Sequence, residues 1–158
     1  GTDRIAEAVK SEDADIVVNI QGDEPEIEPK LIDDLVYMLE NSDTEMGTAV
    51  TSDLTAGDLD NPNVVKVKLN EKCLAVSFSR QPMKGDRIFR HIGIYAFKKH
   101  ILEKFTGLSP SKRENEQKLE QMRALDNRIS INTVITDYEG RGVDTAEDIK
   151  QLKNRFAS

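Results

Sequence analysis

The sequence predicts one α/β domain with an antiparallel hairpin excursion. Three observations point to this fold class: short apolar runs typical of buried strands, helical spacing of apolar residues between those runs, and one stretch in which apolar and polar residues alternate. The chain has 158 residues, 37% of them hydrophobic, which suffices for one domain with a hydrophobic core. Residues 1–158 are therefore interpreted as one domain, with the excursion at about 61–97.

The opening of the chain alternates helices and strands. Residues 4–10 predict a helix with Thr2 and Asp3 as candidate caps, and a helix so near the first residue suggests a chain that has lost its beginning. Residues 15–20 form an apolar run typical of a strand buried on both faces of a parallel sheet. A second helix begins with a first-turn proline, and residues 46–51 form the next strand. We therefore expect an αβαβ series of the doubly wound kind.

The pattern changes after residues 61–63. Apolar residues alternate with lysines over 64–69, a polar turn follows, and alternation resumes over 74–78, which predicts an antiparallel hairpin. We expect this hairpin to cap a cleft or to form a dimer contact. In a monomer it would expose an apolar sheet face, so a homodimer is predicted through this region. The members of that face are Val65, Val67, Leu74 and Val76.

The rest of the chain continues the α/β pattern. The expected elements are a strand at 92–97, a helix at 98–105, a charged helix at about 112–125, a strand at 129–135 and a closing helix at 146–156.

Composition argues against several functions. The formal net charge is −7 and no run of Lys or Arg stands out, whereas nucleic-acid binders usually carry a basic face. The apolar runs, such as residues 16–18, are far too short to cross a bilayer. The single cysteine, Cys73, excludes an intramolecular disulfide and fits a reducing cytoplasm. An acidic protein that handles anionic substrates needs local Arg or Lys, or a divalent cation.

Two acidic turns each follow a predicted strand. Asp23 lies just past the strand at 15–20, beside a glycine that allows a ligand to approach closely. Asp144 lies in the second turn, just before Thr145 and Asp148, which resemble a capping pair. Either turn is also explained as a simple helix start. Because Mg²⁺ takes one or two protein carboxylates, we predict that Asp23 and Asp144 face each other across a cleft and share one ion.

Cationic and polar side chains stand at other strand ends. Arg90 and His91 open one strand, and Arg80 follows the hairpin. Arginine can hold a sugar carboxylate through paired hydrogen bonds, although surface charges that balance an acidic chain explain the same residues. Glu120 and Gln121 fall at the edge of the apolar face of the charged helix, where a solvated helix surface is expected.

The order of several motifs resembles the 3-deoxy-manno-octulosonate (Kdo) cytidylyltransferase, or CMP-Kdo synthetase, family over essentially the whole chain. The motifs are Gly1-Thr2-Asp3-Arg4, Asn19-Ile20-Gln21-Gly22-Asp23-Glu24-Pro25, Asn61-Pro62-Asn63-Val64-Val65-Lys66-Val67, Phe78-Ser79-Arg80, Arg90-His91-Ile92-Gly93-Ile94-Tyr95, Leu119-Glu120-Gln121-Met122-Arg123 and Gly142-Val143-Asp144-Thr145. The resemblance implies a three-layer nucleotide-diphospho-sugar transferase-like fold that lacks its N-terminal βα portion. It also implies cytidylyl transfer from CTP to Kdo, with Mg²⁺, by a cytoplasmic homodimer that pairs through the hairpin.

The resemblance also implies roles for individual residues. Asp23 and Asp144 look like the Mg²⁺ ligands and the catalytic carboxylates. The implied sugar contacts are Gln21, Arg80, His91, Tyr95, Glu120 and Gln121. The nucleotide is implied to lie at Thr2, Asp3 and Arg4.

The sequence departs from the family in three places. The family's cationic opening loop, which meets the triphosphate, has no counterpart, so we expect this chain to bind sugar better than it performs chemistry. The loop 81–89 is short, and only Glu114 matches the family's pattern ahead of Glu120. Two alternatives therefore stay open: a non-catalytic, dimerising sugar-binding module, and a cytidylyltransferase for another acid sugar, either sialic-acid-like or an amino-Kdo.

Overall fold

The computed structural model describes residues 1–143 and 145–156. Its helices are α1 (Thr2–Ala8), α2 (Pro29–Glu40), α3 (Ala56–Asp60), α4 (Lys99–Thr106), α5 (Lys112–Gln117), α6 (Gln121–Asp126) and α7 (Ala146–Phe156). Its strands are β1 (Ile16–Ile20), β2 (Met46–Thr51), β3 (Lys66–Leu69), β4 (Ala75–Ser79), β5 (Ile88–Lys98) and β6 (Ile131–Thr136).

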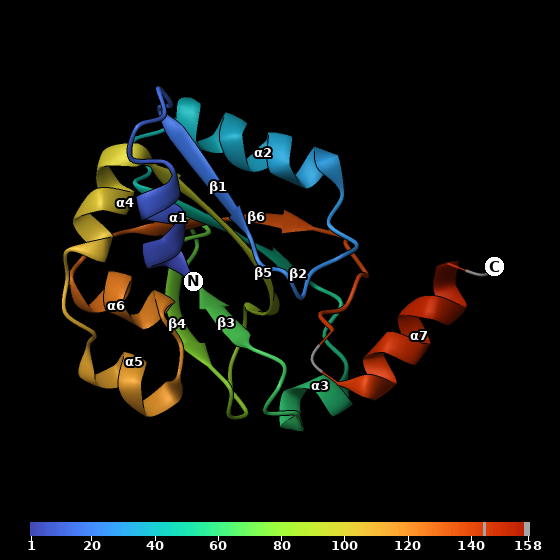
Figure 1. The fold of residues 1–158 in the computed structure, drawn as a ribbon. Coiled ribbons are helices and arrows are strands. Elements are labelled where there is room, and N and C mark those ends of the chain that lie inside the picture. Colours follow the sequence, from blue (N-terminus) through green and yellow to red (C-terminus); the bar gives the residue numbers. More distant parts are fainter. Residues whose placement is uncertain (144, 157–158) are drawn as a thin grey trace.

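The strands form one six-stranded sheet (Figure 1). Its main order is β4-β3-β5-β2-β6, and β1 also pairs with β5. β5 is antiparallel to β1, β2 and β3, whereas β2 and β6 run parallel. The sheet is therefore mixed, and its longest strand lies at the centre.

Helices cover both faces of the sheet. On one face, Leu31, Leu35 and Leu39 of α2 pack against the apolar residues of β2 and β5. On the other face, Phe105 of α4 and Met122 of α6 belong to a larger core cluster, against which α1 also packs. The predicted three-layer α/β class is confirmed.

β1 differs from the parallel strand that we expected. It pairs antiparallel with β5, and its burial alternates until Ile20, which is 43% exposed. Because β5 lies between β1 and β2, the opening segments do not form neighbouring parallel strands. The doubly wound interpretation is therefore wrong, since a short apolar run does not distinguish parallel from antiparallel pairing.

The predicted hairpin is confirmed as β3 and β4, but both strands belong to the main sheet. Val67 is fully buried in the core cluster that α6 covers, whereas Val76 is 47% exposed. The remaining two members of the expected apolar face, Val65 and Leu74, are half-buried. The expectation of one continuous exposed face is wrong, because β3 turns its apolar side toward the core.

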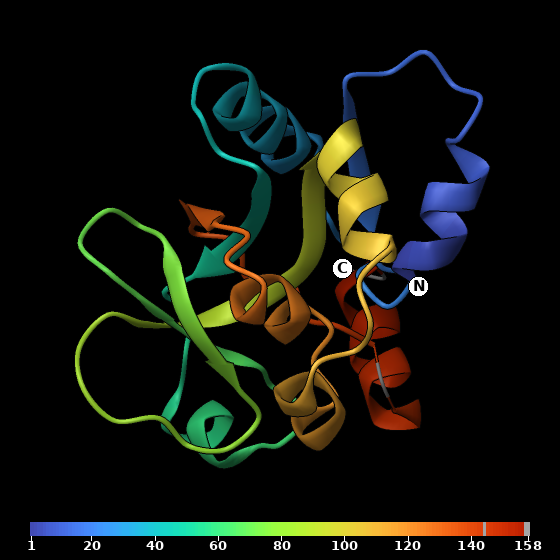
Figure 2. The same cartoon turned by 90° about the vertical axis from the view of Figure 1, so that its left-hand side faces the viewer.

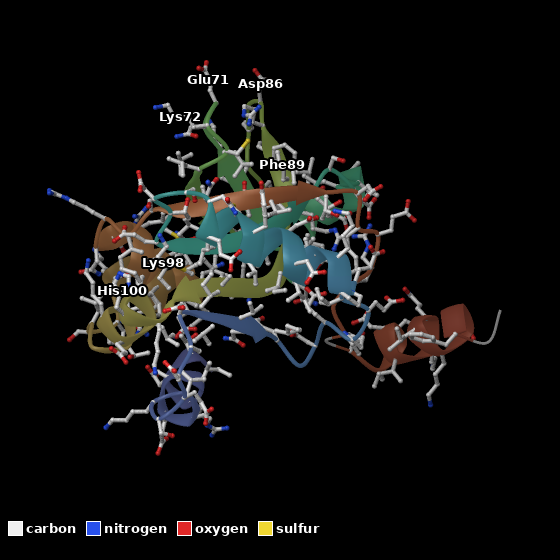
Figure 3. All side chains as sticks on the ribbon, turned by 90° about the horizontal axis from the view of Figure 1, so that it is seen from above. Glu71, Lys72, Asp86, Phe89, Lys98 and His100 are labelled. Atoms are coloured by element: carbon white, nitrogen blue, oxygen red, sulfur yellow. The ribbon has the colours of Figure 1, made fainter. Side chains whose placement is uncertain are left out.

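The hairpin lies on the opposite side of the molecule from α1 (Figure 2). At its tip, Glu71 and Lys72 project from the sheet, close to Asp86 in the loop before β5 (Figure 3). All three side chains are exposed. The end of the sheet at this tip is therefore polar and charged.

Two helical details also differ from expectation. Gly1 rather than Thr2 or Asp3 caps α1, and no side chain bonds at that cap. The helix expected at 112–125 consists of α5 and α6, because Lys118 adopts a left-handed conformation with φ of 56° and ends α5. The additional short helix α3 begins at a capping box.

The closing helix α7 lies apart from the three layers in Figure 1. Its apolar residues Ile149 and Phe156 are 44% and 74% exposed. Neither α7 nor any other helix in the described part of the chain has the length and apolar character needed to span a membrane.

Candidate functional site

A gap along one edge of β5 lies at the centre of the candidate site. β1 pairs with β5 as far as Ile94, and β3 pairs with the same edge as far as Arg90. Between them, the Gly93 carbonyl accepts a hydrogen bond from the Gln21 N–H at 3.0 Å, and the Gly93 N–H donates to Glu24 Oε1 at 2.8 Å. The turn after β1 is therefore held against the middle of β5, where β1 and β3 diverge.

The inner pocket is a cavity of about 170 Å³ between this gap and the segment that joins α5 to α6. The sugar contacts that the sequence predicted all line it: Gln21, Arg80, His91, Tyr95, Glu120 and Gln121. Thr2 lines it as well, and its hydroxyl donates to Glu120 Oε2 at 2.7 Å. Asp3 and Arg4, the other expected nucleotide contacts, are exposed on α1 and lie outside this lining.

The break between α5 and α6 brings Glu120 and Gln121 into the inner pocket. Gln121 is 5% exposed and Glu120 is half-buried, so the expected solvated helix surface is wrong for both. The left-handed Lys118 turns the chain after α5, and Leu119 then enters the core. Sequence spacing assumes one continuous helix and so places these side chains at its rim.

Burial keeps two groups in the inner pocket neutral. The pKa of His91 is lowered to about 3, mainly by removal from water, and the positive charges of Arg80 and Arg90 contribute to this shift. Burial also raises the pKa of Tyr95 above its usual range, and the negative charge of Glu120 adds to that effect. At neutral pH the pocket therefore offers a neutral imidazole and a neutral phenol.

The outer pocket, a cavity of about 540 Å³, adjoins the inner one. Gln21, Arg80 and His91 line both cavities, and Asp23 lines the outer one. The other residues that line it include Asn61, Asn63, Arg90, Arg141, Gly142, Thr145 and Asp148. The structure thus brings the predicted sugar contacts and Asp23 to two neighbouring cavities.

Asp144, the second expected metal ligand, lies outside the described residues. The residue before it is placed, however: the Val143 N–H donates to the carbonyl of Asp23 at 2.7 Å. The predicted capping pair is confirmed, because Thr145 and Asp148 exchange hydrogen bonds of 2.8 and 3.2 Å. In the described ranges, no group of three or more His, Cys, Asp or Glu side chains could hold a metal. A single carboxylate beside an open polar cavity fits Mg²⁺, which leaves most of its positions to water and phosphate oxygens.

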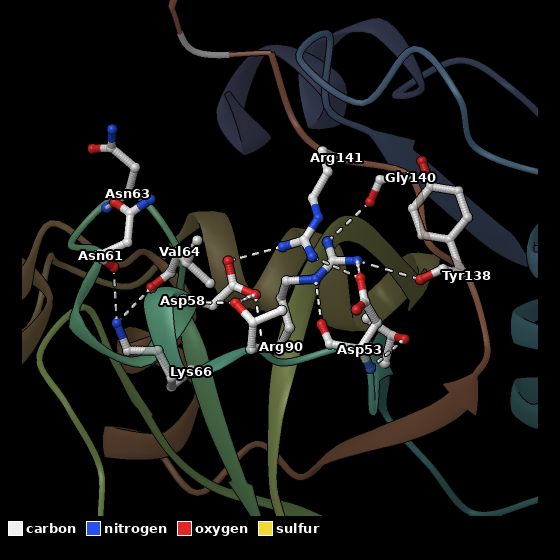
Figure 4. Close-up of polar contacts among 12 residues, drawn as sticks. Asp53, Asp58, Asn61, Asn63, Val64, Lys66, Arg90, Tyr138, Gly140 and Arg141 are labelled. Atoms are coloured by element: carbon white, nitrogen blue, oxygen red, sulfur yellow. Dashed lines mark hydrogen bonds and ion pairs between the residues drawn. The ribbon is translucent and has the colours of Figure 1, made fainter. Parts of the chain in front are cut away.

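An arginine network that the sequence analysis missed holds the segment before Val143 (Figure 4). Arg90, 4% exposed, donates to the carbonyls of Asp53 at 2.9 Å and Gly140 at 3.0 Å. Arg141 pairs with Asp53 at 2.8 Å and with Asp58 at 2.9 Å. Arg90 therefore anchors a loop at the outer pocket, whereas its neighbour His91 also lines the inner pocket. Only strand alternation, which sends successive side chains to opposite faces, could have separated the two roles.

Lys66 is a second group that sequence reasoning missed. It is fully buried, and its ammonium donates to the carbonyls of Asn61 at 3.0 Å and Val64 at 2.8 Å (Figure 4). The ammonium also donates to the carbonyl of Arg80 at 2.7 Å. Burial lowers its pKa, and the nearby charge of Arg80 adds to that effect. Lys66 thus fixes the backbone of Arg80 at the rim of both pockets. An alternating Val-Lys strand gives no sign that one lysine points inward.

Comparison with known proteins finds consistent matches. The family model described as cytidylyltransferase matches residues 1–131. A 3-deoxy-manno-octulosonate cytidylyltransferase of Chloroherpeton thalassium is 47% identical over 97% of this chain and 66% of its own length. The protein of that name from Geotalea uraniireducens is 40% identical over 99% of this chain and 69% of its own length. The chain therefore spans about two thirds of the length of the curated relatives that it matches.

Solved structures also resemble this chain. A CMP:2-keto-3-deoxy-manno-octonic acid synthetase complexed with CTP is 32% identical, with a TM-score of 0.90 over 99% of this chain and 67% of that one. A glucose-1-phosphate thymidylyltransferase from Bacillus anthracis, 12% identical with a TM-score of 0.64, shares the fold alone.

Proposed function

This chain belongs to the cytidylyltransferase family, and we propose that the protein transfers the cytidylyl group of CTP to Kdo, giving CMP-Kdo and pyrophosphate. The observation that carries the proposal is the inner pocket, whose lining gathers the predicted sugar contacts from segments far apart in the sequence. Relatives and a solved structure named for this sugar support the choice of substrate.

The inner pocket has the donors and acceptors that an acid sugar requires. Arg80 is suited to the carboxylate, since a guanidinium offers paired donors. Neutral His91 and Tyr95, together with Glu120 and Gln121, offer partners for hydroxyl groups. Contacts at several points orient the sugar, so that its anomeric hydroxyl can attack the α-phosphorus of CTP in line with less loss of entropy.

We propose that Asp23 and Asp144 hold Mg²⁺ in the outer pocket. Support comes from the position of Asp23, which lines the cavity that adjoins the inner pocket. The ion, when bound, would neutralise the phosphates of the nucleotide. Asp23 contributes a carboxylate from a turn that Gly93 and Val143 hold on either side.

We also propose a cytoplasmic homodimer that pairs through residues 61–97. The exposed Val76 and the charged hairpin tip of Glu71 and Lys72 support this interface. We expect Val76→Asp to lower the mass measured by light scattering toward that of the monomer. A mass of 17.7 kDa for the unaltered chain at working concentration would contradict the dimer.

The direct test of the proposed function is calorimetric titration of the chain with Kdo. We expect binding, and Arg80→Met should raise the dissociation constant at least ~10-fold, about 1.4 kcal/mol, because it removes the paired donors. Lys104→Met, on an exposed lysine of α4 that lines neither pocket, is the control and should leave the constant unchanged. Absence of Kdo binding by the unaltered, folded chain would contradict the proposal.

A pyrophosphate-release assay with CTP, Kdo and Mg²⁺ separates the proposal from a non-catalytic sugar-binding module. The assay uses a chain extended to the full length of the relatives. Turnover supports the transferase, and Asp23→Asn should abolish it while Kdo still binds. Sugar binding without any turnover would favour the module instead.

A further inference from the structure

Thr48 reaches the inner-pocket histidine because β5 bulges opposite β2. The pairing steps from Thr48 opposite Tyr95 to Ala49 opposite Ile92, so the residues between 92 and 95 have no partner on β2. Thr48 is fully buried and lies at this irregularity in the pairing. Its Oγ1 lies 2.7 Å from the Ile94 carbonyl and 2.9 Å from His91 Nε2.

The single hydroxyl proton of Thr48 decides the direction of both contacts. The Ile94 carbonyl can only accept, so the hydroxyl donates to it. Oγ1 must then accept the hydrogen bond from His91, which requires the proton on Nε2. Within the described residues, no hydrogen bond to His91 Nδ1 occurs, so this nitrogen is the one left for a ligand.

We propose that Thr48 is a positioning residue that fixes His91 in its Nε2–H tautomer, so that Nδ1 accepts a hydrogen bond from a hydroxyl group of the ligand in the inner pocket. The ring contacts on either side, with Phe78 at 5.5 Å and Tyr95 at 5.3 Å between centroids, hold the imidazole plane. Only the identity of the ligand rests on the proposed function; the tautomer does not.

The tautomer restricts which group of a ligand can contact His91. An imidazole nitrogen with a lone pair attracts a donor and repels a carboxylate or a phosphate oxygen. A sugar with its carboxylate at Arg80 and a hydroxyl at His91 satisfies both groups, whereas the reversed orientation satisfies neither. His91 would therefore select a polyhydroxylated acid and fix which end of it faces the hairpin.

Nitrogen-15 NMR of the imidazoles tests the tautomer without any ligand. The chain has two histidines, and the second, His100, is exposed on α4 (Figure 3), so it provides an internal reference. We expect His91 at neutral pH to show a protonated Nε2 and an unprotonated Nδ1 in the unaltered chain and in Thr48→Ser, which keeps the hydroxyl. Thr48→Val should give a mixture of tautomers, with the His100 signals unchanged.

Calorimetric titration with Kdo then tests the consequence. We expect the dissociation constant to rise ~10-fold in Thr48→Val and to recover in Thr48→Ser. A His91 with its proton on Nδ1 in the unaltered chain would overturn the proposal, and this measurement needs no variant to fold. An Nε2–H tautomer in a chain that binds no Kdo would support the role of Thr48 and would contradict the proposed function instead.

Discussion

Gly93→Ala should destabilise the turn that carries the candidate metal ligand. A Cβ at residue 93 would lie 3.0 Å from Gln21 Oε1, 3.1 Å from Glu24 Cγ and 3.2 Å from Glu24 Oε1. These separations are too short for ordinary contact, so both side chains must move by a few tenths of an ångström. The same movement would lengthen the hydrogen bond between Gly93 N–H and Glu24 Oε1, which is 2.8 Å.

The expected cost combines three effects. Overpacking a buried site typically costs ~1–3 kcal/mol. Losing a hydrogen bond to a charged group costs ~1.5–3 kcal/mol, of which a lengthened bond forfeits only part. Alanine in a strand recovers ~0.5–1 kcal/mol relative to glycine. We therefore expect Gly93→Ala to lower the free energy of unfolding by about 2 kcal/mol.

The matched control lies in the same turn. No described atom comes within 4 Å of a Cβ built on Gly22, so Gly22→Ala should change the free energy of unfolding by less than ~0.5 kcal/mol. Urea unfolding followed by circular dichroism measures both variants. Equal midpoints for Gly93→Ala, Gly22→Ala and the unaltered chain would show that the contact between Gly93 and Glu24 does not hold the turn against β5.

Three further predictions concern buried ionisable groups. Because the pKa of His91 is lowered to about 3 in the folded chain, only the unfolded chain takes up a proton on this residue near pH 6. Between pH 7 and pH 5, the unaltered chain should therefore lose about 2 kcal/mol more of its free energy of unfolding than His91→Gln, as measured by urea unfolding. Equal losses in the two chains would contradict this prediction. Lys66→Met should lower the free energy of unfolding by about 3 kcal/mol in urea unfolding, since three carbonyls lose their donor. The control is Lys68→Met, on a half-exposed lysine, and a loss no larger than in this control would refute the prediction. Arg123→Leu should lower the free energy of unfolding by about 3 kcal/mol in the same assay, since it breaks the paired hydrogen bonds of 2.9 and 2.6 Å to Glu114. An unchanged midpoint would show that this ion pair does not stabilise the fold.

Much of the fold was predictable because its elements carry local patterns. The apolar runs gave β1 and β2, the alternation gave β3 and β4, and a first-turn proline marked α2. The pairing of those strands was not predictable in the same way. That β5 lies between β1 and β2 depends on contacts between residues about 40 to 80 positions apart, which no local pattern encodes.

The residues of the candidate site also differ in whether a local pattern could predict them. Side chains that stand just past a strand, such as Asp23 and Arg80, could be picked from position and chemistry alone. Glu120 and Gln121 could not, because a single left-handed residue, Lys118, decides whether they face water or the inner pocket. For those two, only the order of motifs shared with the family indicated a role.

The groups that escaped prediction share a physical feature: each acts through backbone carbonyls that lie far away in the sequence. Lys66 holds the carbonyl of Arg80, Arg90 holds that of Gly140, and Thr48 holds that of Ile94. The Ile94 carbonyl needs a buried donor because the bulge in β5 interrupts its ladder with β2, and an unpaired buried carbonyl is costly. Arg80 and Gly140 lie past the ends of β4 and β6, where the regular ladders have stopped. Irregular backbone around the site thus creates a need for buried polar side chains beside it. Substituting these supporting residues should therefore alter ligand binding even though none of their described contacts is to a ligand.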